Sequence, residues 1–323
     1  MAYDIDPELA AALDAMPKGP NGAALDFSDI PAFRARMTAA MAALPVPAPD
    51  PRVAVETLGI PRDDGTVLDV VLFRPGGTGG PRPCLLYFHA GAQVLGSAHD
   101  PASRAYAAAM ALRLDIVLAV VDYRLAPETP APGATEDGYL AYTHLAAAAN
   151  AAAHGIAPDR IGLAGASGGG APAAATALMV RDRGQRRPRL LSLNYPMLDD
   201  RNDTPSSHEI TDLGLYDRRE NLYAWAAVLG ERVGAPDVHP YCAPGRATDL
   251  AGLPDTFVAV AQYDVFRDED LDFARRLTAA GVPVDLHLYA HAFHAWDVFA
   301  PDSALAATFG RTWDDFLRRR LHG

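Results

Sequence analysis

The pattern of apolar and polar residues changes beyond the glycine-rich turn at 76–80. From there on, short apolar runs alternate with longer stretches in which apolar residues recur at helical spacing. Such alternation is typical of a mostly parallel sheet covered by helices on both faces, so the sequence predicts an α/β fold. The expected strands lie near 84–88, 116–121, 160–164, 189–194, 256–261 and 284–289, and the expected helices near 101–113, 133–153, 168–183, 268–280 and 302–320.

The residues before this region predict a different organisation. We expect two helices at 6–16 and 29–44, a proline-rich linker at 45–51, and two antiparallel strands within 52–73. A polar stretch and an aromatic-bearing helix interrupt the later alternation at 198–235, which we interpret as an insertion. The expected parts are therefore 1–50, an α/β domain formed by 51–197 and 236–323, and the insertion 198–235.

Composition narrows the class of protein. The 323 residues carry 28 Lys+Arg and 40 Asp+Glu, a net charge of −12, and half of them are hydrophobic, which excludes a mainly disordered chain. Lys18 is the only lysine, so we expect no nucleic-acid partner. Cys84 and Cys242 are too few for a disulfide framework. We see no signal peptide and no run of ~18 apolar residues, so a cytoplasmic protein without a membrane span is expected.

The segment Gly165-Ala166-Ser167-Gly168-Gly169 joins an expected strand to an expected helix. In a nucleophile elbow, the residues two before and two after the serine must be nearly free of side chain, because the turn is sharp. Gly165 and Gly169 meet that requirement, and Ser167 is the candidate nucleophile. A phosphate-binding loop is excluded, since the chain contains no Gly-x-x-x-x-Gly-Lys-Ser/Thr.

A serine nucleophile needs a base and an acid that orients the base. Asp264 follows the expected strand 256–261, at the sheet edge where Ser167 also emerges. His291 and His294 follow the strand 284–289, and one of them should be the base. Three further acids begin a helix, where the helix dipole gives them a structural role; they are Asp268, Glu269 and Asp270. No His-Glu-x-x-His occurs, so we expect no metal and no cofactor.

An acyl-transfer site also needs backbone N–H groups directed at the oxyanion. The strand at 84–88 leads into His89-Ala90-Gly91-Ala92, whose small residues would let the backbone approach a substrate. A tight strand-to-helix turn is the alternative interpretation of this loop. The order of loop, serine, aspartate and histidine favours the catalytic one.

Over about 52–320, the chain resembles the hormone-sensitive-lipase-like carboxylesterases, bacterial family IV of the α/β-hydrolases. The motifs of that family are His-Gly-Gly-Gly, Tyr-Arg-Leu-Ala-Pro-Glu, Gly-Asp-Ser-Ala-Gly, Asp-Pro-Leu-Arg-Asp-Glu and Tyr-x-x-x-x-His-Gly-Phe. The similar stretches of this chain are 87–92 with 96–97, 122–128, 165–169, 264–269 and 289–296.

The resemblance implies a Ser167–His294–Asp264 triad and selects His294 over His291. It also implies short-to-medium acyl esters as substrates, and a cap made from the N-terminal helices and the insertion. Arg124 and Glu128 would hold a loop, and a homodimer is consistent with the family. The implied oxyanion hole is formed by the N–H groups of Gly91, Ala92 and Gly168, and the residues expected to border the substrate are Leu215, Tyr216, Tyr223 and Trp225.

Three departures from the family motifs keep other functions open. Ala90 and Ala92 replace glycines of the oxyanion loop, and Ala166 replaces the acidic residue before the nucleophile. A lyase or cyclase that reuses the site is one alternative. A ligand-binding protein is another, although the presence of His294 favours catalysis. The net charge of −12 would disfavour anionic substrates, so neutral esters are expected.

Overall fold

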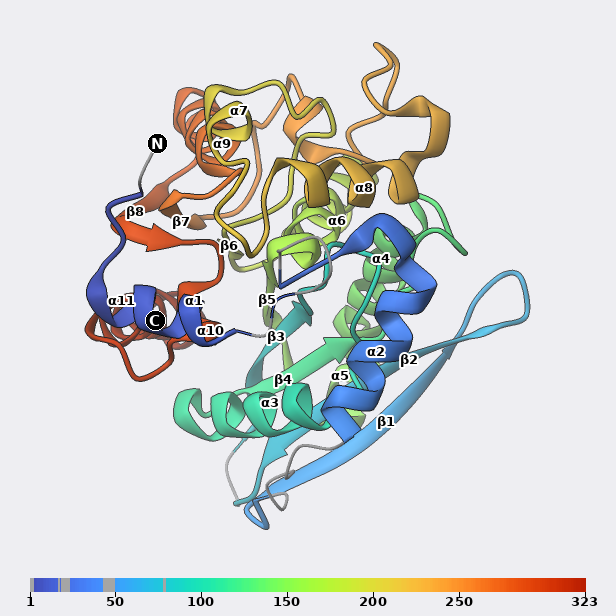
Figure 1. The fold of residues 1–323 in the computed structure, drawn as a ribbon. Coiled ribbons are helices and arrows are strands. Elements are labelled where there is room, and N and C mark those ends of the chain that lie inside the picture. The colour runs from blue at the N-terminus through green and yellow to red at the C-terminus, as the bar shows by residue number, and fades with distance from the viewer. Residues whose placement is uncertain (1–2, 17, 19–23, 43–49, 78–79) are drawn as a thin grey trace.

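A computed structural model describes residues 3–16, 18, 24–42, 50–77 and 80–323 (Figure 1). Its centre is one sheet with the strand order β1-β2-β4-β3-β5-β6-β7-β8. β1 and β2 form an antiparallel hairpin, β2 pairs antiparallel with β4, and the remaining pairs are parallel. The strands are β1 Val53–Pro61, β2 Val67–Pro75, β3 Arg82–Phe88, β4 Val117–Val121, β5 Ile156–Ala166, β6 Leu191–Asn194, β7 Thr256–Tyr263 and β8 Val284–Phe293.

Helices cover both faces of this sheet, because the central strands are apolar on both sides. On one face, Leu85 of β3 packs in a core with α3 Pro101–Leu114 and α11 Ala304–His322. On the other, Leu86 packs in a core with residues of α4 Gly133–Ala146, α6 Gly170–Asp182 and α9 Arg267–Ala279. The predicted fold class, a mostly parallel sheet between two helical layers, is confirmed.

The predicted helix at 133–153 is wrong in one respect, since it is two helices. Ala147 is extended, with ψ 126°, between α4 and α5 Ala148–Ala153. The Asn150 side chain donates to the His144 carbonyl at 3.0 Å and so satisfies the end of α4. An alanine-rich run favours helix throughout and gives no sign of this break.

The N-terminal helices are α1 Pro7–Ala15 and α2 Ile30–Ala42, and residues 43–49, which include most of the predicted linker, lie outside the described residues. The insertion contains α7 Pro205–Glu209 and α8 Arg218–Leu229. Figure 1 shows α8, in gold, above the central strands. The two regions touch: the ring of Phe27, just before α2, packs 6.0 Å from that of Tyr216. The division into a cap and a catalytic part stays a prediction.

Candidate active site

The strand β5 leads into a sharp turn at Ser167. Ser167 has φ 52°, in the left-handed region, and begins the short 3₁₀ turn that precedes α6. A Cβ on Gly165 would lie 2.2 Å from the carbonyl oxygen of Gly169, which only a glycine at 165 avoids. The small residues on either side of the serine are therefore a steric requirement of this turn.

Three side chains from three turns form one hydrogen-bonded line. The Ser167 Oγ lies 2.9 Å from the His294 Nε2, and the His294 Nδ1 lies 2.8 Å from the Asp264 Oδ2. All three are buried, and Asp264 is 0% exposed. With the proton on Nδ1 directed at a carboxylate, the lone pair of Nε2 faces the serine hydroxyl. The second oxygen of Asp264 accepts from the Phe266 N–H at 3.0 Å, so the carboxylate is fixed at both ends.

The alternative base, His291, lies elsewhere. It is exposed, and its Nδ1 is 2.7 Å from the carbonyl oxygen of Asp4. Two of the three competing acids have other partners, and the third, Asp270, is buried and its carboxyl has no hydrogen-bond partner among the described residues. Asp268 accepts from the Ser206 N–H at 2.7 Å, and Glu269 accepts from the Leu198 N–H at 2.7 Å. The structure thus brings His294 and Asp264, rather than their competitors, to Ser167.

The loop after β3 turns left-handed over three successive residues. Gly91, Ala92 and Gln93 have φ values of 131°, 52° and 60°. A Cβ on Gly168 would lie 2.3 Å from the Ala92 nitrogen, so the backbones of Gly168 and Ala92 are in close contact beside Ser167. Within the described residues, the Ala92 N–H donates to no protein acceptor. An alanine tolerates this conformation at a cost of about 1–2 kcal/mol, which the family's glycine would not incur.

The loop that follows β3 is held from two sides. The Tyr123 hydroxyl donates to the His89 carbonyl at 2.7 Å, and the Tyr123 ring stacks on His89 at 4.3 Å. Burial lowers the pKa of His89, so its imidazole is neutral near pH 7. A further anchor of the loop, which no sequence motif indicates, comes from α2.

That anchor is Arg34. Its Nε donates to the Val94 carbonyl, its second terminal nitrogen donates to the Ala126 carbonyl, both at 2.5 Å, and its first pairs with Glu128 at 2.6 Å. Glu128 therefore acts on the loop through Arg34. No motif around Arg34 in the sequence of α2 indicates such a role.

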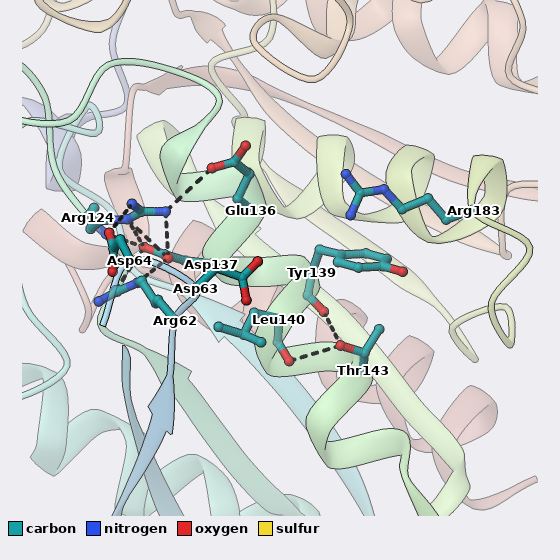
Figure 2. A pocket seen from close by; sticks show the side chains of 10 residues that line it. All are labelled: Arg62, Asp63, Asp64, Arg124, Glu136, Asp137, Tyr139, Leu140, Thr143 and Arg183. Carbon is teal, nitrogen blue, oxygen red and sulfur yellow. Dashed lines mark hydrogen bonds and ion pairs between the residues drawn. The ribbon is translucent and has the colours of Figure 1, made fainter. Parts of the chain in front are cut away.

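Arg124, the other residue expected to hold a loop, lies in a separate pocket of about 400 Å³ (Figure 2). It pairs with the buried Asp137 at 3.0 Å, as does Arg62 from the β1–β2 turn, at 2.7 Å. Arg183 stacks over the Tyr139 ring at 4.4 Å on the far wall. Ser167, Asp264 and His294 do not line this pocket.

The four residues expected to border the substrate differ in position. The Tyr216 ring lies 5.1 Å from the His294 ring, so the insertion reaches the site through this side chain. Leu215 and Trp225 are fully buried in the core that joins the insertion to the sheet. Tyr223 is 40% exposed on α8.

An aromatic residue that the sequence pattern did not indicate lies on one side of His294. The Tyr195 ring lies 5.1 Å from the imidazole, and the Tyr195 hydroxyl donates to the Asp297 Oδ1 at 2.9 Å. Asp297 is the second residue of the short helix α10 Trp296–Phe299 and lies three residues after His294. Only the spacing of three residues from the histidine could have drawn attention to it.

Among the described residues, no group of three or more His, Cys, Asp or Glu could hold a metal ion. No helix in the described ranges has both the length and the apolar composition needed to cross a membrane.

Comparisons with known proteins agree with this geometry. A family model described as alpha/beta hydrolase fold matches residues 85–298. The carboxylesterase NlhH of Mycobacterium tuberculosis is 34% identical over 327 residues, covering 99% of this chain and 97% of that protein. Esterase LipI of the same organism is 36% identical over 253 residues, covering 75% and 74%. The solved structure of a bacterial heroin esterase superposes with a TM-score of 0.89 at 36% identity, covering 98% of both chains.

The chain therefore belongs to the α/β-hydrolase fold family, within the hormone-sensitive-lipase-like carboxylesterases that its motifs resemble. The predicted class of enzyme, a carboxylic ester hydrolase, is confirmed by these relatives.

Proposed function

We propose that the enzyme hydrolyses short-to-medium acyl esters through an acyl-enzyme on Ser167. The observation that carries the proposal is the continuous line from the Ser167 Oγ through both nitrogens of His294 to Asp264, with distances of 2.9 and 2.8 Å. A serine hydroxyl is a weak nucleophile until a base can take its proton. Here the base stands within reach of that proton and is oriented by a buried carboxylate.

In the proposed reaction, the Ser167 Oγ attacks the ester carbonyl while the His294 Nε2 takes the serine proton. Backbone N–H groups of Ala92, Gly168 and Gly91 would stabilise the negative charge that develops on the carbonyl oxygen. His294 then gives its proton to the leaving alcohol, and the acyl group stays on Ser167. Water activated by the same histidine releases the acid and restores the serine.

The proposed substrate range follows from what surrounds the site. Tyr216 is the insertion residue in contact with His294, and we propose that it borders the bound ester. Tyr223, Leu215 and Trp225 are proposed to shape the same region from α8 and the residues before it. Replacement of Tyr216 by alanine should therefore change the preferred acyl length more than replacement of the exposed Tyr223.

Labelling with a fluorophosphonate probe tests the nucleophile, and a panel of p-nitrophenyl esters of increasing acyl length tests the substrate class. We expect the probe to label Ser167, and Ser167→Ala and His294→Ala to lower kcat by roughly 10⁴-fold or more. His291→Ala is the matched control, because that histidine is exposed in β8, three residues before His294, and its loss should leave kcat unchanged. An unlabelled Ser167 in folded protein would exclude the proposal. Labelling without hydrolysis of any ester would favour a lyase or cyclase.

A further inference from the structure

Asp297 is an acid beside the proposed triad that the mechanism above does not use. It is half-buried, and burial raises its pKa to about 6, while the Tyr195 hydroxyl and the His294 charge oppose that rise. At pH 7 the carboxylate is therefore mostly ionised. A partly desolvated negative charge is unfavourable unless another group neutralises it.

One tyrosine contacts this carboxylate, since the Tyr195 hydroxyl donates to it directly. Burial raises the pKa of the Tyr87 and Tyr106 phenols, and the charge of Asp297 adds to the rise, so both phenols lie within range of that charge. The rings of Tyr87 and Tyr106 lie 6.4 Å apart. Within the described residues, neither phenol has a hydrogen-bond partner, and Tyr106 keeps 43% of its surface exposed although burial raises its pKa. The Tyr106 side chain is thus open to solvent on part of its surface.

No protein cation neutralises Asp297 among the described residues. The ion pairs among the described residues include none to this carboxylate, and Arg113, whose charge acts on Tyr106, is already paired with Asp314 at 2.7 Å. Aromatic faces and a carboxylate together favour an organic ammonium ion, because the rings attract cations and the acid supplies the counter-charge. The net charge of −12 also favours the approach of cations.

We propose that Asp297, Tyr87, Tyr106 and Tyr195 form a subsite for the ammonium group of cationic ester substrates. The proposal rests on the esterase function proposed above and specifies its substrate. The Tyr195 ring connects the subsite to the proposed base, since it contacts the His294 ring at 5.1 Å and Asp297 through its hydroxyl. A substrate could therefore place its ester at Ser167 and a quaternary or protonated amine beside Asp297.

Two pairs of esters that differ only in charge test the proposal. Acetylcholine and 3,3-dimethylbutyl acetate carry the trimethylammonium group or its neutral tert-butyl isostere in the alcohol. The p-nitrophenyl esters of 4-(trimethylammonio)butyrate and 5,5-dimethylhexanoate carry them in the acyl group. In at least one pair, we expect the wild-type enzyme to prefer the cationic ester by roughly tenfold in kcat/KM.

Asp297→Asn should remove that preference while leaving kcat/KM for the neutral ester within about twofold. Asp302→Asn is the matched control, because it removes one negative charge from an exposed position five residues away. Equal rates for both members of each pair in the wild type, or an unchanged preference in Asp297→Asn, would overturn the subsite.

Hydrolysis of the neutral esters shows whether the proposed triad mechanism has failed, independently of the subsite. If Ser167→Ala hydrolyses them as fast as the wild type, the proposed mechanism fails, and the subsite is then tested by calorimetric binding of tetramethylammonium. Binding that Asp297→Asn weakens would support the subsite even then. No binding by the wild-type protein would exclude it.

Discussion

Asp264 and Asp297 both lie beside His294, yet their surroundings differ. Asp264 is fully buried, with one oxygen on the imidazole and the other on a backbone N–H. Asp297 is half-buried, receives a hydrogen bond from Tyr195, and has no ion-pair partner among the described residues other than the nearby charge of His294. We infer that these two aspartates, on two sides of one histidine, have different roles. Full hydrogen bonding fixes a carboxylate for orientation, whereas incomplete neutralisation prepares it for a ligand.

The largest expected difference between the two acids is in turnover of neutral esters. Asp264→Asn should lower kcat by roughly 10³–10⁴-fold, because an amide cannot hold the imidazole with its proton on Nδ1. Asp297→Asn should leave kcat for a neutral ester nearly unchanged. Steady-state kinetics on p-nitrophenyl butyrate, with circular dichroism to show that both variants fold, makes the measurement. Similar losses in both variants would show that the two aspartates share one role.

A smaller effect is expected in the pH dependence of cation preference. As the pH falls through about 6, Asp297 takes up a proton and the preference for a cationic ester over its neutral isostere should disappear. The ratio of the two kcat/KM values isolates this effect, because any effect of pH on the shared chemical step changes both rates alike. The charged or titratable groups that influence this region are His294, Tyr195, Tyr87, Tyr106 and the Arg113–Asp314 pair.

Tyr195→Phe sharpens the same measurement. Removing the hydroxyl removes a bond that stabilises the ionised carboxylate, so the pKa of Asp297 should rise and the midpoint should move to higher pH. A midpoint that stays in place in Tyr195→Phe would show that another group controls the preference.

The smallest expected effect concerns a third buried acid, Glu220 of α8, which has no catalytic neighbour. One oxygen accepts from Arg219 at 3.0 Å, whereas burial, followed by the hydrogen bond and charge of Asp217, raises its pKa to about 8. Since the folded protein holds this proton more tightly than the unfolded chain, stability falls as the pH rises from about 4.5 through about 8.

Glu220→Gln should therefore stabilise the protein by about 1–3 kcal/mol at pH 9 and have little effect at pH 5. Thermal unfolding at the two pH values measures the change, and Glu231→Gln, at an exposed position, is the control. An equal effect of Glu220→Gln on stability at both pH values would show that the Glu220 carboxyl does not keep its proton in the folded protein.

A feature of this site can be predicted from the sequence when its physical cause acts between residues that are close together in the chain. The turn at Ser167 is predictable because the requirement for Gly165 and Gly169 is steric and acts within five residues. The choice of Asp264 follows from strand order, since the carboxyl ends of parallel strands meet at one edge. The selection of His294 over His291 needed the family motif, because the sequence pattern ends the strand at 289 and so predicts both histidines after it. In the structure β8 extends to Phe293 and includes His291.

The rest depends on contacts between distant segments. Tyr87 and Tyr106 come near Asp297 only because β3, α3 and α10 pack on one face of the sheet, and no spacing along the chain encodes this. The buried position of Trp225 and the contact of Tyr216 with His294 likewise depend on how the insertion packs. Side-chain packing across elements is what the sequence pattern leaves open.

The contacts of Arg34 have a consequence for building hybrid enzymes from this family. A designer who replaces the first 50 residues with the corresponding segment of a relative exchanges more than a covering surface. The exchange also removes the donor that holds the carbonyls of Val94 and Ala126. Such a chimera keeps a supported oxyanion loop only if the donor segment brings a guanidinium to the same place, so the N-terminal helices and the loop should be transplanted as one module.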